Sequence, residues 1–327
     1  MGKRKQLGIK RLKEILRRQD PPGRGRDYIP AIRAERTEAP GRSRPSRVWS
    51  PKLGREIHVL SLVEQRALWL ALYHPDLIDL HEQRMLAVEP RPHPLEGHPA
   101  VTDEHLPPFQ GTIAVASRLG SIRHHPFVTM RTDDGDSVKV PYPFIGDLLL
   151  FLVDAAGPYC VNWTIKLDSQ GFHRRAGGSK PVRDPEQAEA KARIRHAIEE
   201  IYYRDAGIPT IRVVRRDIPD ALEGNLRRLY SSFSTRVDLD DDARSAVIDR
   251  LQGCLLTGQP PLEAFLVLRG QLDLDIMQLK ALMEQAIWNR ALRVDLFEGP
   301  VFCDKPLVPE RTDVLDQYAT WFNRGAA

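Results

Sequence analysis

The amino-acid sequence predicts an α/β fold in which helices cover a mixed sheet, followed by a small helical domain. Two apolar, strand-like segments at 144–153 and 159–167 are separated by a short Ala-Ala-Gly turn, which indicates a buried antiparallel pair. A long helical pattern at 184–207 then leads into a further strand-like segment at 208–215. Beyond residue 234 the apolar spacing becomes that of short helices, so we expect a second domain there.

The length of the chain predicts more than one domain. With 327 residues it is longer than one hydrophobic core usually serves. We expect residues 1–45 to be a basic, largely extended arm, 46–234 the α/β domain and 235–327 the helical domain. The last boundary follows from the polar, acidic stretch at 235–242.

Positive charge is concentrated in the arm. Residues 1–47 contain 15 Lys and Arg against 5 Asp and Glu, a net +10, whereas the whole chain carries +4 and the remainder therefore −6. Such an arm suits a polyanion, because phosphate backbones bind basic segments through counterion release. A merely solvated tail is the alternative. Since Gly and Pro leave 23–47 little apolar surface, we expect this stretch to order on a partner or on the domain surface.

Composition disfavours several classes of protein. The sequence has no apolar run of about eighteen residues and no apolar stretch behind its basic N-terminus, so we expect a cytoplasmic protein without a membrane span or secretory signal. Cys160, Cys254 and Cys303 lie far apart and show no Cys-x-x-Cys or Cys/His pattern. This spacing argues against a disulfide framework or a structural zinc site.

Turn and capping signals predict the elements that precede the apolar strands. An amphipathic helix is expected within the first twenty residues, and a hairpin at 46–60 around a Pro-Lys-Leu-Gly turn. Ser61 and Glu64 make a capping-box pattern that opens the next helix. We expect a strand at 77–87 and a second hairpin around the Asp-Asp-Gly-Asp turn at 133–136.

The C-terminal part is predicted to be helical. Helices are expected at 219–233, 240–256, 261–269 and 274–289. A two-stranded wing at 292–302 would complete a winged-helix shape, which commonly places a helix in the DNA major groove. The candidate recognition stretch, 273–290, has three acids against two bases, too little positive charge for a phosphate footprint. Protein binding therefore fits this domain better than DNA binding.

Two charged residues stand out in the apolar strands. Asp147 interrupts the first strand and Lys166 lies near the end of the second, and antiparallel pairing would bring them side by side. Such a pair suits phosphodiester hydrolysis, because the acid can bind Mg²⁺ and the lysine can steady the attacking water or the phosphorane charge. Glu64 would complete the metal site. The structural alternatives are a buried Asp147–Lys166 ion pair and a simple helix cap at Glu64.

Several segments carry a family resemblance. They are Arg24-Gly25-Arg26-Asp27-Tyr28-Ile29-Pro30, Gly41-Arg42-Ser43, His58-Val59-Leu60-Ser61 with Glu64, and Asp79-Leu80-His81-Glu82-Gln83. A helical Glu, an Asp and an x-Lys strand motif resemble the restriction-endonuclease-like superfamily. With the segments above, the chain resembles the TnsA family, the endonuclease subunits of heteromeric transposases, over about residues 23–216. The resemblance implies a restriction-endonuclease-like mixed sheet flanked by helices.

The resemblance also implies a set of site residues. Glu64, Asp147 and Lys166 would be catalytic. Glu64, Asp147 and the backbone carbonyl of Ile165 would hold two Mg²⁺ ions, with Mn²⁺ as a substitute. Glu199, on the long helix, would lie close to the site as a supporting acid. An ordinary exposed helix face is the alternative for Glu199.

Two features depart from the family pattern. Thr164 stands two residues before the lysine, where Glu, Asp or Gln is usual, so a side-chain metal ligand is lost. A basic insert follows at 168–183, and we interpret it as a phosphate-contacting loop. The expected DNA contacts are Arg174, Arg175, Lys180 and Arg183 of this insert, with Arg24 and Arg26 of the arm.

The implied activity is hydrolysis of the non-transferred strand at the 5′ side of transposon ends during cut-and-paste transposition, in a prokaryotic cytoplasm and at the nucleoid. The implied partners are double-stranded DNA at the element ends, a TnsB-type DDE transposase, and a TnsC-type ATPase regulator that contacts the C-terminal domain. A non-catalytic, DNA-bridging adaptor is the alternative, because Thr164 weakens the metal site. A free-standing restriction or repair nuclease is disfavoured, because no segment resembles a target-recognition domain.

Overall fold

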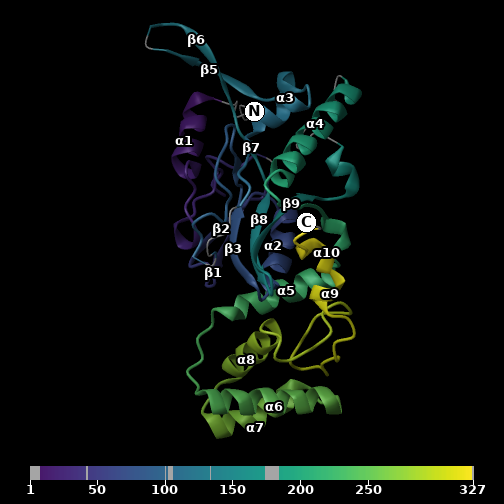
Figure 1. The fold of residues 1–327 in the computed structure, drawn as a ribbon. Helices are drawn as coiled ribbons and strands as arrows, with labels where there is room; N and C mark the ends of the chain where they lie inside the picture. Colours follow the sequence, from purple (N-terminus) through teal and green to yellow (C-terminus); the bar gives the residue numbers. More distant parts are fainter. Residues whose placement is uncertain are drawn as a thin grey trace. The chain divides into compact units, whose positions relative to one another are not determined.

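The computed structural model describes residues 8–41, 43–99, 101, 106–132, 134–173 and 184–325. The chain forms two compact units (Figure 1). The first unit comprises Met1–Ala67, Asp76–Arg216 and Trp321–Ala327, and the second comprises Leu68–Pro75 and Asp217–Thr320. The sequence placed the division near residue 235, but the helix at 220–233 belongs to the second unit.

A four-stranded mixed sheet forms the centre of the first unit. Its order is β10-β9-β8-β3, with bounds Thr210–Val214, Gly157–Lys166, Leu148–Asp154 and Leu77–Glu82. β3 and β9 pair antiparallel with β8, whereas β10 runs parallel to β9. The predicted mixed sheet is therefore confirmed. The residues of β8 from Leu148 to Leu152 are all buried, which explains why this strand reads as an apolar run rather than as an alternation.

Helices cover both faces of this sheet. On one face, Leu149 and Phe151 of β8 pack in a core with α3 (Thr112–Arg118) and α4 (Pro185–Arg204), seen in Figure 1. Asp184 caps α4, since its Oδ1 accepts the Gln187 N–H at 2.9 Å, as the sequence predicted. On the other face, the indole N–H of Trp163 donates to the carbonyl of Trp321, near the end of α10 (Ala319–Phe322).

The predicted hairpins are confirmed. β1 (Ser46–Ser50) pairs antiparallel with β2 (Arg55–Val59), and β5 (Phe127–Arg131) with β6 (Ser137–Pro141). Asp133, in the second turn, lies outside the described residues. Gly54 closes the first turn with φ of +65°, a conformation that costs glycine little.

Two segments predicted as single strands are each broken in two. The predicted strand 77–87 forms β3 and β4 (Met85–Leu86), and the predicted strand 144–153 forms β7 (Phe144–Ile145) and β8. The breaks face one another, because the Gln83 N–H donates to the Asp147 carbonyl at 3.0 Å and the Gly146 N–H to the Arg84 carbonyl at 2.8 Å. This paired bend places Gln83 and Asp147 at the same end of the sheet.

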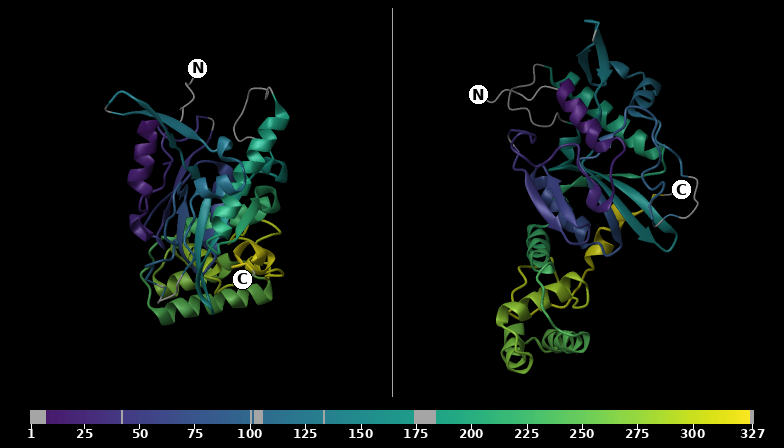
Figure 2. Two further views of the ribbon diagram at one scale, coloured as in Figure 1. Left: turned by 45° about the horizontal axis from the view of Figure 1, so that its top comes forward. Right: turned by 90° about the vertical axis from the view of Figure 1, so that its left-hand side faces the viewer.

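The described part of the N-terminal arm is folded onto the first unit. Helix α1 (Ile9–Gln19) buries Leu12 and Ile15 in a small core with residues of β4, β5 and the loop after β6. Figure 2 shows α1 beside the β5–β6 hairpin. Tyr28 is also buried, and its hydroxyl donates to the carbonyl of Glu82 at 2.7 Å. The arm after α1 is mostly irregular and packs on the domain surface, so at least these residues are not a free tail.

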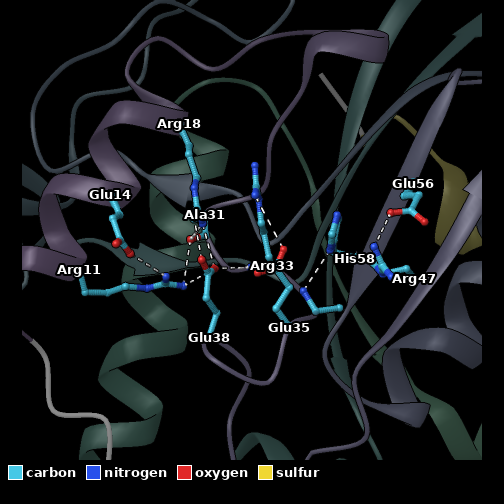
Figure 3. Close-up of polar contacts among 11 residues, drawn as sticks. Arg11, Glu14, Arg18, Ala31, Arg33, Glu35, Glu38, Arg47, Glu56 and His58 are labelled. Carbon is cyan, nitrogen blue, oxygen red and sulfur yellow. Dashed lines mark hydrogen bonds and ion pairs between the residues drawn. The ribbon is translucent and has the colours of Figure 1, made fainter.

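Glu38 joins the parts of the arm (Figure 3). Its carboxylate accepts from the guanidinium groups of Arg11 at 2.9 Å and Arg18 at 2.7 and 2.9 Å, and from the Arg33 N–H at 2.8 Å. Burial alone would raise the pKa of Glu38, but these donors outweigh it and hold the pKa well below its usual value. Two positive charges of the arm are therefore paired within the arm itself.

Acidification is expected to loosen this arm. A carboxyl whose folded pKa is depressed contributes stability above its unfolded pKa, about 4.5, and loses it as the pH falls toward the folded pKa. We therefore expect the difference in free energy of unfolding between the wild type and Glu38→Gln to be largest near pH 7 and to shrink below pH 4.5. Urea unfolding across this range measures it. The control is Glu35→Gln, at an exposed carboxylate 3.8 Å from Arg33. A difference independent of pH would contradict the prediction.

The second unit is helical. Four of its helices confirm the predicted ones: α5 (Asp220–Phe233), α6 (Asp241–Thr257), α7 (Pro261–Leu272) and α8 (Ile276–Trp288). The unit also contains the end of α2 (Leu62–Tyr73) and a short helix that the sequence did not predict, α9 (Val314–Gln317). α5 belongs to this unit because Gln285 of α8 donates to the carbonyls of Ser232 and Thr235. No helix of the described residues has the length and apolar character needed to cross a membrane.

The predicted two-stranded wing at 292–302 is wrong. All of this segment is described, and it contains no strand; Val294 makes a single bridge to Pro309. The backbone polar groups of the segment are satisfied by side chains instead. The Asn225 amide donates to the carbonyls of Leu296 and Gly299 and accepts the Val301 N–H, and Asp295 accepts two further N–H groups. A loop held in this way does not need a partner strand.

Candidate active site

Asp147 and Lys166 meet at one end of the central sheet. The β8–β9 register pairs Leu148 with Trp163, which brings Asp147, just before β8, beside the last residues of β9. Asp147 Oδ2 accepts the Ile165 N–H at 2.7 Å and lies 3.1 Å from Lys166 Nζ. The Lys166 ammonium also donates to the Ile165 carbonyl at 2.9 Å. The juxtaposition predicted from the sequence is present, in the form of an ion pair whose side chains are about one-fifth exposed.

Glu64 is held in place in the first turn of α2. Its Oε2 accepts the Leu60 N–H at 2.8 Å, and its Oε1 accepts the Ser61 hydroxyl at 2.9 Å. Ser61 Oγ in turn accepts the Glu64 N–H at 3.2 Å. The capping interaction considered as the structural alternative is therefore present, although the acid bonds the N–H of Leu60 rather than that of Ser61.

Glu64 nevertheless interacts with Asp147. Burial and the negative charge of Asp147 raise the pKa of Glu64 to about 7, against the lowering effect of its hydrogen bonds. A carboxylate placed only to cap a helix has no need of a second carboxylate nearby. The proximity of the two acids is the feature that a bound cation would stabilise.

Glu199 lies on the buried face of α4, so the exposed-face alternative is wrong. Only 4% of the residue is exposed, and its Oε1 accepts the Thr164 hydroxyl at 2.9 Å and the Asn162 amide at 3.3 Å. Burial and the charge of Asp147 raise the pKa of Glu199. Thr164 thus binds an acid that comes from the helix.

Gln83 is a site residue that the sequence reasoning did not single out. Its side-chain amide donates to Glu64 Oε2 at 2.9 Å. Its backbone N–H donates to the backbone carbonyl of Asp147, and its own carbonyl accepts the Ala31 N–H at 3.1 Å. It has a φ of +48°, which is uncommon for a non-glycine residue. The sequence feature that could have identified Gln83 was its position at the end of the Asp79–Gln83 segment.

The remaining residues of that segment are structural. Asp79 Oδ2 accepts the Gly25 N–H at 2.9 Å, and the His81 ring stacks on Tyr28 with centroids 3.9 Å apart. Glu82 is fully buried and forms a two-point ion pair with Arg55, both distances being 2.9 Å. The segments at 24–30 and 79–83 therefore bind to one another and hold the arm beside the site.

The predicted DNA contacts fall into three groups. The Arg24 guanidinium donates to the carbonyls of Pro94, Glu96 and Gly97, so it is already engaged with the backbone. Arg26 is exposed. The four basic residues of the insert lie outside the described residues; they are Arg174, Arg175, Lys180 and Arg183.

The residues present fit a hard divalent cation. Asp147, Glu64 and the Ile165 carbonyl offer only oxygen atoms, the ligands that Mg²⁺ prefers. No described residue donates a hydrogen bond to Asp147 Oδ1, which leaves that oxygen available. Within the described ranges, however, no three His, Cys, Asp or Glu side chains cluster closely enough to hold a metal ion. Side-chain ligation of such an ion would therefore come from two carboxylates, supplemented by a backbone carbonyl.

Two comparisons with known proteins give no relative. A scan of protein-family models found no model that matches this chain, and a search of curated proteins found no match either. The candidate site is thus defined by its own residues and geometry.

Proposed function

We propose that this protein is a Mg²⁺-dependent DNA endonuclease. One observation carries the proposal: Asp147, Lys166 and the Ile165 carbonyl meet at the end of a mixed sheet, beside two further acids whose pKa values are raised. Perturbed acids gathered around a lysine are typical of catalytic sites. A purely structural ion pair would account for Asp147 and Lys166. It would not account for Glu64 and Glu199, whose pKa values are raised by burial and by the charge of Asp147.

Each residue has a distinct proposed role. Asp147, Glu64 and the Ile165 carbonyl would hold Mg²⁺, and the bound ion would polarise the phosphate and lower the pKa of an attacking water. Lys166 supplies a positive charge next to Asp147, where it can stabilise the negative charge that develops on the phosphate oxygens. Glu199 acts as a supporting acid held by Thr164, and Gln83 orients the Glu64 carboxylate.

The resemblance to TnsA supports a narrower proposal. The chain would hydrolyse the non-transferred strand at the 5′ side of transposon ends, while a TnsB-type DDE transposase cuts and joins the other strand. A TnsC-type ATPase would bind the C-terminal helical unit. The balance of charge at 273–290 favours a protein partner there over DNA.

A non-catalytic adaptor is the second candidate, and specific observations favour it. The Glu64 carboxylate already receives hydrogen bonds from Leu60, Ser61 and Gln83, and the described residues contain no cluster of three side-chain metal ligands. In that case the chain would bridge DNA and the regulator without cutting.

Strand-specific cleavage separates the two candidates. Purified protein, the proposed TnsB-type transposase, DNA carrying both element ends and Mg²⁺ are combined, and the breaks on each strand are mapped. We expect breaks at the 5′ sides that require this chain and disappear with EDTA, while omission of this chain leaves 3′ cutting intact. If 3′ cutting and strand joining proceed and 5′ breaks never form, the adaptor function is the correct one.

A further inference from the structure

The ammonium of Lys166 contacts the same two groups that are proposed to bind the metal. Its Nζ lies 3.1 Å from Asp147 Oδ2 and 2.9 Å from the Ile165 carbonyl oxygen. We infer that Lys166 is a built-in competitor for the divalent cation, occupying the cation position until Mg²⁺ displaces its ammonium. This inference rests on the proposed function, and it adds a role for Lys166 in controlling metal occupancy.

The two cations cannot use these oxygens in the same way at once. Mg²⁺ binds oxygen at about 2.0–2.1 Å, whereas the ammonium hydrogen-bonds the same atoms at about 3 Å. An ion that bridged both oxygens would lie within a few ångströms of Nζ, where two positive charges repel strongly. The ammonium must therefore leave at least one of its two acceptors when the metal binds.

The surroundings of Lys166 permit this exchange. The side chain is about one-fifth exposed, and Nζ lies 5.7 Å from the centre of the Phe172 ring, within reach of a cation–π contact. The stem passes closely over Gly171, where an added Cβ would lie 2.9 Å from Lys166 Cβ. The aliphatic part of Lys166 is thus confined by Gly171, while the Phe172 ring offers its ammonium a second contact. An ammonium displaced by the metal would therefore remain at the site.

Arg195 provides a matched control for simple charge repulsion. It also lies near the acids, because it lowers the pKa of Glu199, and its guanidinium donates to the Ile145 carbonyl at 3.2 Å. Its other contact among the described residues is with the Phe144 ring, whose centre lies 5.9 Å from the guanidinium carbon, so it engages neither Asp147 nor Ile165. Removing Arg195 therefore takes away a neighbouring positive charge without vacating the proposed metal ligands.

Mn²⁺ binding, followed by the electron paramagnetic resonance signal of the free ion, tests the inference without any cleavage. Lys166→Met is expected to bind Mn²⁺ roughly tenfold more tightly than the wild type, equivalent to about 1.4 kcal/mol. Lys166→Gln, which keeps a neutral donor, is expected to give a smaller gain and serves as a second variant if Lys166→Met does not fold. Arg195→Met is expected to change the affinity less than about threefold, and Asp147→Asn to abolish tight binding.

The outcomes separate this inference from the proposed function. If Mn²⁺ binds to the wild type and neither Lys166 variant binds more tightly, or Arg195→Met matches their gain, the competition is disproved while the metal site stands. If neither the wild type nor any variant binds Mn²⁺, both the inference and the proposed metal-dependent function are overturned.

Discussion

Asp147→Asn is expected to lower the rate of Mg²⁺-dependent 5′-strand cleavage by roughly a thousandfold, about 4 kcal/mol of transition-state stabilisation. The substitution removes the negative charge that binds the metal. It keeps an oxygen that can accept the Ile165 N–H, so the end of the sheet should remain folded. The single-turnover rate on end-containing DNA at saturating Mg²⁺ measures the effect.

The matched control lies at the other end of β8, the strand that begins directly after Asp147. Asp154→Asn makes the same chemical change at the far end of β8, where the carboxylate is exposed and pairs with Arg324 at 2.6 Å. We expect this variant to cleave at the wild-type rate. Wild-type cleavage by Asp147→Asn would show that the catalytic centre lies elsewhere. Equal losses in both variants would point to destabilisation, which thermal unfolding checks.

Glu82→Ala is expected to lower the free energy of unfolding by about 3–5 kcal/mol. Glu82 is fully buried and accepts two hydrogen bonds from Arg55, itself buried, and one from the His58 N–H at 2.9 Å. Truncation leaves the Arg55 guanidinium without its ion-pair partner in a place that water does not reach. Urea unfolding of the purified variant measures the loss.

The balance within this ion pair predicts how a double variant behaves. Burial is the largest influence on the pKa of Glu82 and raises it, which reflects the cost of removing this carboxylate from water. We therefore expect Arg55→Met/Glu82→Leu to be less destabilised than Glu82→Ala. Glu56→Ala, which breaks the exposed pair with Arg47 at 3.0 Å, should cost less than about 1 kcal/mol. A loss for Glu82→Ala no larger than this control would contradict the prediction.

Substitution of Glu82 is also expected to disturb the geometry of the candidate site. Gln83, the next residue, holds the Glu64 carboxylate through its side chain and the bend at Asp147 through its backbone N–H. The buried Arg55–Glu82 ion pair fixes the position of the backbone at Gln83. We therefore expect the charged residues of the 79–83 segment to affect the proposed site by positioning Gln83 rather than by contacting DNA.

Local patterns were sufficient for much of the fold. The hairpins around Gly54 and Gly135 are confirmed because turn residues and β-prone flanks act over a few residues. The cap of α4 at Asp184 depends on one side chain and one N–H three residues away. Asp147 and Lys166 were paired correctly because a short turn between two apolar strands leaves few possible registers.

Other features depended on residues distant in the sequence. The wing at 292–302 did not form because Asn225, about seventy residues earlier, satisfies its backbone. The bends at Gln83 and Asp147 depend on hydrogen bonds between two segments sixty-four residues apart. Glu199 looked like part of a charged, solvated face, yet packing turns it toward Thr164 and Asn162. No window of local sequence contains these partners.

Periodicity, turns and caps act locally, so the sequence was enough to predict the mixed α/β class, the pairing of Asp147 with Lys166 and the helical character of the C-terminal part. The docking of the described arm through Glu38, and the orientation of Glu199 toward Thr164, became evident in the folded structure. It also decided that the Lys166 ammonium spans Asp147 and the Ile165 carbonyl. Burial and charge pairing depend on which distant segments meet in space, and the order of residues along the chain does not specify that locally.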